Sequence, residues 1–169
     1  MIGERADVMK KISAIAVMIS MVFFAAAPAW PSDEKEWLAL TDKAINYFQA
    51  GKKKEAIATA RRALKMGEEI FGAEDLKVVG SIDDLASYLK ADGKYVEAEA
   101  LYKRALSILE KRLPPDDRYL AIFLNYLANF YDNIKKPGKA AAMRARANAI
   151  RSGANKSADS SRDKTETSK

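Results

Sequence analysis

The side chains best suited to chemistry in this 169-residue sequence are carboxylates and amides, because the chain contains no cysteine and no histidine. Thiol catalysis, disulfides, histidine acid–base catalysis and zinc sites with sulfur or imidazole ligands are therefore excluded. Adjacent carboxylates occur at Asp83-Asp84 and Asp116-Asp117, but neighbouring residues of a helix point about 100° apart and do not converge. With no glycine-rich phosphate loop either, the sequence predicts no catalytic residue, no metal site and no cofactor.

Three asparagines spaced by four residues form a second polar feature. They are Asn125, Asn129 and Asn133, in the stretch LNYLANFYDN. The apolar pattern around them predicts an amphipathic helix with the three amides on one face. Because an amide both donates and accepts hydrogen bonds, such a row could hold the backbone of an extended peptide without reading its sequence. The alternative is a solvated helix surface on which Asn133 closes the helix.

The helix that carries this row belongs to a repeat with a period of 42 residues. Gly51, Gly93 and Lys135 mark equivalent turns in three copies. Small residues are expected where the two helices of a unit cross, and large apolar residues between units. Five columns keep this order, namely Ala44, Ala86 and Ala128; Ala56, Ala98 and Ala140; Ala63, Ala105 and Ala147; Leu40, Ile82 and Leu124; and Tyr47, Leu89 and Tyr131.

The spacing of these columns resembles the tetratricopeptide repeat, in the longer form found in kinesin light chains. The stretch DGKYVEAEALYKRALSILEKRL, at 92–113, carries the resemblance most clearly. It implies an all-α fold, a tetratricopeptide-like α-α superhelix of three helix-turn-helix repeats within residues 34–151. The repeats are expected at about 37–78, 79–120 and 121–151, and the helices at 34–50, 53–71, 75–91, 95–112, 116–133 and 137–151.

The two outer repeats depart from this pattern. Ala60 and Arg144 stand where the middle repeat has the large side chain of Tyr102, so looser packing is expected at both ends. The sequence also offers no additional capping helix after the last one. The apolar face of that helix is therefore expected to be partly exposed, or covered by a partner or a second copy.

The resemblance further implies that the first helix of each repeat lines a concave groove. Thr41 and Ile45 stand where some relatives clamp a peptide carboxylate, which argues against that form of recognition. Side-chain specificity is expected from Phe48, Lys90 and Tyr126. The predicted groove residues are Thr41, Asp83, Ser87, Lys90, Asn125, Tyr126, Asn129 and Asn133.

Charge is divided between the two helices of each repeat. Carboxylates outnumber cations in the expected first helices, and cations outnumber carboxylates in the second. The groove is therefore expected to take neutral or basic peptides, and the outer side to contact anionic lipid or an acidic protein. The alternative for the outer side is a solvated surface of mixed charge.

The N-terminal segment has the layout of a signal peptide. Arg5, Lys10 and Lys11 precede an apolar run at 12–27, and Ala27-Pro28-Ala29 fits a cleavage site. Residues 1–29 are thus expected to direct export, to the periplasm or outside the cell. The alternative is an uncleaved inner-membrane anchor at 12–27, although that run is shorter than the roughly 20 residues of a full span.

Export argues against nucleic acid as the partner, despite a formal charge of +6. The polar segment 152–169 is expected to be disordered. The sequence thus predicts an exported, non-enzymatic scaffold that binds a peptide or a partner protein. The alternative is a self-associating structural subunit of an envelope complex, a homo-oligomer held at the membrane by its N-terminal segment.

Overall fold

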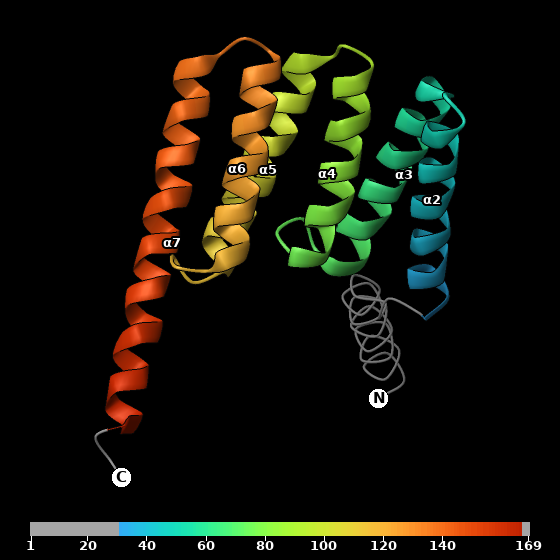
Figure 1. Cartoon of the computed structure of the whole chain (residues 1–169). Coiled ribbons are helices and arrows are strands. Elements are labelled where there is room, and N and C mark those ends of the chain that lie inside the picture. Colours follow the sequence, from blue (N-terminus) through green and yellow to red (C-terminus); the bar gives the residue numbers. More distant parts are fainter. Residues whose placement is uncertain (1–30, 167–169) are drawn as a thin grey trace, which may run out of the picture.

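A computed structural model describes residues 31–166, with side chains over 33–153. Figure 1 shows the helices of this range standing side by side in sequence order, from α2 in blue to α7 in red. The all-α fold of helix-turn-helix pairs is confirmed, with α2 packed on α3, α4 on α5, and α6 on α7. The helices are α2 (Pro31–Gln49), α3 (Lys53–Phe71), α4 (Leu76–Ala91), α5 (Tyr95–Arg112), α6 (Arg118–Asn133) and α7 (Pro137–Glu166).

The expected export segment at 1–29 lies outside the described residues. Within the range that is described, no helix has both the length and the apolar character needed to cross a membrane.

The turn inside each pair repeats the same backbone geometry. Gly51, Gly93 and Lys135 have φ values of 74°, 79° and 57°, which place all three in the left-handed region. The next amide in each turn reaches back to close the first helix, and the bond from Lys136 to the carbonyl of Tyr131 measures 2.8 Å. This is the usual way for a helix to satisfy its last carbonyls. Only the third turn requires a residue with a side chain to adopt that conformation.

The connections between pairs begin the next helix with an aspartate cap. The side chain of Asp75 accepts a hydrogen bond from the amide of Lys77 at 2.8 Å, and that of Asp117 from the amide of Tyr119 at 2.7 Å. These bonds satisfy amides that a helix start leaves without partners. Asp75 is therefore the N-cap of α4, and Asp117 is the N-cap of α6.

The repeat columns form the core. Every alanine in the three alanine columns is at most 2% exposed. The column of Leu40, Ile82 and Leu124 is buried in the same way, at 8%, 0% and 0%. Burial of one residue type at one position in each pair explains why the 42-residue period can be followed through the sequence.

Side-chain contacts join the helices into two layers. The first-helix layer is α2, α4 and α6. Phe48 of α2 stacks on Tyr88 of α4 with 4.5 Å between ring centroids. The Ser87 hydroxyl of α4 lies 2.8 Å from that of Tyr126 on α6. The second-helix layer is α3, α5 and α7, where ion pairs connect each helix with the next. The ion pairs are Arg61 with Glu97, Arg104 with Glu68, and Arg146 with Glu110.

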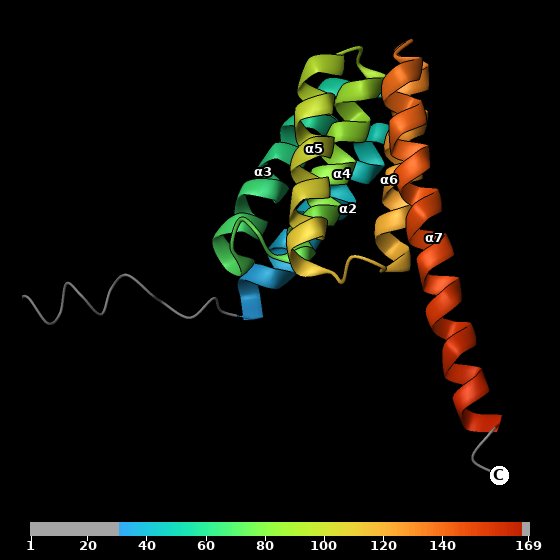
Figure 2. The ribbon, with the colours of Figure 1, turned by 90° about the vertical axis from the view of Figure 1, so that its left-hand side faces the viewer.

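The last helix includes most of the polar segment that is expected to be disordered. Helix α7 continues through the polar segment from Ser152 to Glu166, and it extends past the other helices (Figure 1 and Figure 2). No proline follows Pro137, so no residue of the segment blocks the helical hydrogen bonds. The expected disorder of residues 152–169 stays a prediction.

Candidate functional site

The exposed side of α2, α4 and α6, here called the first-helix face, is built from rows of equivalent residues. Positions 42 residues apart occupy equivalent places on the three helices. Leu38 and Ile122 are 50% and 54% exposed, although both are large and apolar. The three rows used below are Leu38, Gly80 and Ile122; Thr41, Asp83 and Asn125; and Ile45, Ser87 and Asn129.

The asparagine row is divided between two surroundings. Asn125 is partly buried, and its side-chain amide donates to the carbonyl of Ala121 at 3.0 Å. Asn129 is exposed, and its oxygen accepts from Arg144 of α7 at 3.2 Å. Asn133 is exposed at the end of α6. Two of the three amides thus already make a hydrogen bond within the chain, and the role of the row as a backbone-holding surface stays a prediction.

Three hydroxyl groups meet between α4, α5 and α6. The Ser87 hydroxyl lies 2.8 Å from that of Tyr126 and 3.2 Å from that of Tyr102, and the two tyrosine hydroxyls are 3.2 Å apart. Burial raises the pKa of Tyr102, so its hydroxyl stays protonated at neutral pH. Lys90 lies over the ring of Tyr126, 5.7 Å from its centroid. The predicted groove residues Ser87, Lys90 and Tyr126 therefore come together in one cluster.

Asp83 lies beside this cluster without a hydrogen-bond partner for one of its oxygens. Its Oδ1 is enclosed and receives no hydrogen bond. Burial, with a smaller contribution from the neighbouring charge of Asp84, raises the pKa of Asp83 to about 6. Lys90 opposes this rise only partly. The carboxylate is thus held in a position where its charged form is poorly compensated.

Thr41, the α2 member of the same row, faces a different environment. Its hydroxyl donates to the carbonyl of Trp37 at 3.0 Å. It lines a small pocket of about 10 Å³, whose other lining residues are Ala44, Ala60, Ala63, Ser81 and Asp84. Burial also raises the pKa of Asp84. The predicted groove residues are therefore gathered on α4 and α6, and Thr41 belongs to the junction between the first two repeats.

Cations on the outer side are largely paired. In the second-helix layer, Glu68 and Glu110 occupy one repeat column, and Arg104 and Arg146 occupy another. Each arginine binds the glutamate 36 residues before it. Sequence reasoning predicted a basic outer side but missed this pairing, which the 42-residue columns of opposite charge could have revealed.

The strongest ionic cluster of the outer side is centred on Glu99. Its side chain is 13% exposed and accepts hydrogen bonds from Lys136 at 2.9 Å and Lys139 at 2.7 Å. The bonds from Lys139 and Lys136 lower the pKa of Glu99 to about 2. These lysines are therefore partly neutralised within the chain, and contact of this side with anionic lipid stays a prediction.

Comparison with protein families identifies residues 38–76 and 78–119 as matches to the tetratricopeptide repeat. These segments correspond to the first two helix pairs. Comparison with curated protein sequences found no match.

Solved structures share the fold. The crystal structure of BtubC (BKLC) from P. vanneervenii is 24% identical, with a TM-score of 0.65, and covers 83% of this chain. A putative kinesin light chain from Podospora anserina with nearly identical TPR-like repeats is 20% identical, with a TM-score of 0.60, and covers 69% of it. This chain spans 56% of each of those two chains.

A third match is the N-terminal domain of stress-induced protein-1 (STI-1) from C. elegans. It is 11% identical, with a TM-score of 0.56, and the match covers 72% of this chain and 89% of that one. At these identities the likeness establishes the fold alone.

Proposed function

We propose, on the premise that this chain belongs to the tetratricopeptide repeat family through residues 38–119, that it is a non-enzymatic scaffold which binds a segment of a partner protein on its first-helix face. Tetratricopeptide repeats are protein-interaction modules, so a protein partner follows from the family. The choice of face is the further step.

One observation carries that choice: Leu38 and Ile122, at equivalent positions of the first-helix face, leave half of their large apolar surface in water. Exposed apolar side chains at repeated positions are typical of binding surfaces. The polar groups of Ser87, Asn125 and Asn129 lie in the rows beside them. Apolar anchors next to hydrogen-bonding groups suit an extended peptide, whose main chain and side chains need both.

The test compares an exposed apolar residue of each layer. Ile122→Arg places a charge on the first-helix face, and Val96→Arg places one on α5, where Val96 is 85% exposed. Partner recovery from the envelope of the source cell, by crosslinking to the full chain, is expected to fall at least tenfold with Ile122→Arg and to be unchanged with Val96→Arg. Equal recovery with both variants would contradict binding at this face.

Export of the chain is proposed with this function. It is supported by the basic, apolar and small-residue pattern of residues 1–29. The N-terminal residue of the protein recovered from cells checks it. Cleavage after Ala29 gives a chain that begins at Trp30, whereas an intact N-terminus in the membrane fraction supports the anchor.

Self-association is the alternative function, and the ion pairs of the second-helix layer do not favour it. Arg62 is equivalent to Arg104 and Arg146. If a second copy stacked on α7, its Arg62 would face the residue of the first copy that follows Glu68 and Glu110 in their column. That position is Ser152, which carries no charge. Light scattering decides between the two, because a monomer at micromolar concentration contradicts self-assembly.

A further inference from the structure

A hollow of about 330 Å³ lies where the connection between α5 and α6 meets α7. Two of its lining residues, Arg146 and Glu110, form an ion pair. The remaining lining residues are apolar, namely Pro115, Leu120, Ala149 and Ile150. None of them belongs to the rows that define the first-helix face. The hollow is therefore a different surface from the one proposed above.

The equivalent place in the preceding repeat is closed. Ile108 of α5 stands in the same column as Ile150, and it is 2% exposed. Ile150 itself is only partly buried. The same column thus provides a covered isoleucine at the first connection between repeats and a partly uncovered one at the second. Aliphatic surface that lines an open hollow favours an apolar occupant.

Cations of α5 hold the first connection, between α3 and α4, against that helix. Arg104 donates to the carbonyl of Ala73 at 2.9 Å. Arg112 donates to the carbonyl of Glu74 at 2.8 Å. Lys111 donates to the Glu74 carboxylate, and this hydrogen bond lowers the pKa of Glu74. The charge and two carbonyls of the first connection are therefore satisfied within the chain.

The second connection lacks the equivalent cations. At the places of Lys111 and Arg112, α7 has Gly153 and Ala154. Asp116, which follows Pro115 of the lining, occupies the place of Glu74 and is exposed. Among the described side chains, none forms an ion pair with Asp116 or donates to the carbonyl of Pro115. The rim of the hollow thus presents an acidic group and a carbonyl that a cation from outside can reach.

We propose that this hollow is a second docking site, which takes a segment of a partner protein with an aliphatic side chain beside lysine or arginine. The aliphatic group packs against Ile150 and Leu120, and the cationic group donates to Asp116 and to the carbonyl of Pro115. The partner thus supplies what the cations of α5 supply at the first connection. This inference goes beyond the proposed function, because the site lies outside the first-helix face.

The experiment uses the full chain and two labelled, end-capped peptides. One has the sequence LSILEKRL of residues 106–113, which carries two of the cations that hold the first connection. The other has glutamine in place of its lysine and arginine. Fluorescence anisotropy at constant ionic strength is expected to show binding of the basic peptide about tenfold tighter than the glutamine peptide, as for charge-assisted hydrogen bonds. The net positive charge of the chain opposes this order, so overall charge does not produce it.

Variants locate the site. Asp116→Asn is expected to reduce the preference for the basic peptide to less than about twofold, whereas Glu69→Gln, which removes the same charge from exposed α3, is expected to preserve it. Ala149→Trp fills the hollow and is expected to weaken binding of both peptides by about tenfold or more. Ala141→Trp, at an exposed position of α7 outside the lining, is expected to leave binding unchanged. Both tryptophan variants should keep the thermal unfolding midpoint of the wild type, because both alanines are exposed.

The outcomes distinguish this inference from the proposed function. Equal binding of the two peptides by the wild type overturns the inference, and so do equal effects of the two tryptophan variants. Ile122→Arg, on the first-helix face, is expected to leave binding of the basic peptide unchanged. If Ile122→Arg weakens that binding and Ala149→Trp does not, the peptide occupies the first-helix face, which overturns the inference alone. Absence of binding by both peptides overturns it as well, while the crosslinking comparison still judges the proposed function.

Discussion

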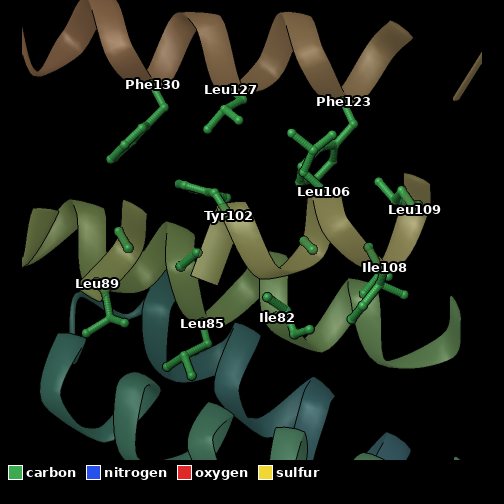
Figure 3. Packing of buried hydrophobic residues seen from close by; sticks show 14 of the residues in the cluster. Ile82, Leu85, Leu89, Tyr102, Leu106, Ile108, Leu109, Phe123, Leu127 and Phe130 are labelled. Atoms are coloured by element: carbon green, nitrogen blue, oxygen red, sulfur yellow. The ribbon is translucent and has the colours of Figure 1, made fainter. Parts of the chain in front are cut away.

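The two junctions between repeats use equivalent positions but fill them differently. At the junction of the second and third repeats, Tyr102, Phe123 and Tyr126 place aromatic rings between α5 and α6 (Figure 3 shows the first two). The equivalent residues at the first junction are Ala60, Ser81 and Asp84, which line the pocket beside Thr41. Rings occupy these positions at the second junction, whereas small and polar groups occupy them at the first.

The distance between the helices at each junction differs with the size of the side chains that fill it. Helices α3 and α4 approach each other more closely than α5 and α6 do. Across this junction, a Cβ on Gly67 of α3 would lie 3.5 Å from the Val78 side chain of α4, which is an ordinary packing distance. The looser packing expected at Ala60 thus appears as a small pocket. The close approach of α3 and α4 keeps the remainder of the junction buried. One repeat pattern therefore tolerates two solutions to the same packing problem.

Removal of the central ring of the second junction should have the largest effect. Tyr102 is fully buried and packs edge-on against Phe130, with 5.0 Å between centroids. Tyr102→Ala is expected to lower the free energy of unfolding by about 3–5 kcal/mol, as for other large-to-alanine changes in a core. Urea unfolding measures it. Tyr102→Phe, which removes only the hydroxyl, should lose about 1 kcal/mol, and a loss that small in Tyr102→Ala would mean that the ring is dispensable.

Transplanting the large residue into the first junction should be the next largest effect. Ala60→Tyr restores the repeat pattern but inserts a ring where the helices are already close. Overpacking of this kind is expected to lower the free energy of unfolding by about 1–3 kcal/mol. The matched variant Ala60→Ser should change it by less than about 1 kcal/mol. A stabilised Ala60→Tyr protein would show that the pocket can accommodate the ring and that the two junctions are interchangeable.

The two junctions can also be compared by the pH dependence of stability, through the partly buried carboxylates Asp83 and Asp84. Folded Asp83, with a pKa of about 6 against the usual 3.8, keeps its proton at pH values where the unfolded chain has lost it. Its contribution to stability is therefore greatest below about pH 4 and falls as pH rises through 6.

Asp83→Asn should remove this pH dependence. After allowance for its partial exposure, the variant is expected to be about 1 kcal/mol more stable than the wild type at pH 7 and unchanged at pH 4. Chemical denaturation at both pH values measures it. Asp84→Asn, at the first junction, should change stability in the same direction, because burial raises that pKa too. If the stability difference between the wild type and each variant were the same at pH 4 and pH 7, the burial of these carboxylates would be contradicted.

The smallest effect is expected where the two junctions are alike. The ion pairs Glu68–Arg104 and Glu110–Arg146 connect the second helices at equivalent positions and are partly exposed. A double-mutant cycle with glutamine at each position should give less than about 1 kcal/mol for either pair, and the same value for both within error. Unequal coupling energies would show that the outer layer, too, distinguishes the junctions.

The helices and their pairing could be predicted from the sequence, because they depend on residue size and spacing. The columns of Ala44, Ala86 and Ala128 predict where helices cross, and the turns at Gly51, Gly93 and Lys135 predict where each pair reverses. Both depend on the residues nearby in the chain, and both were confirmed by burial and backbone geometry.

The polar contacts were harder to predict, because each depends on a partner that only folding brings near. Ser87 and Tyr126 are 39 residues apart, and no local pattern indicates that their hydroxyls meet. Asn125 and Asn129 look equivalent in the sequence, yet one bonds its own helix and the other bonds α7. Helical spacing places residues on a face, but the neighbouring helices decide what each side chain can reach.

Lys135 sets the order in which the protein is expected to open. The first two turns use glycine for their left-handed residue, whereas the third holds a lysine at φ 57°, a conformation that L-residues other than glycine avoid by roughly 1 kcal/mol. The turn of the α6–α7 pair thus carries a conformational cost that the turns of the other two pairs do not. Transient separation of α7 is therefore expected to be the most frequent local opening of the chain. Backbone amides in the last turns of α7 that pack on the core should exchange with solvent earliest among the repeats.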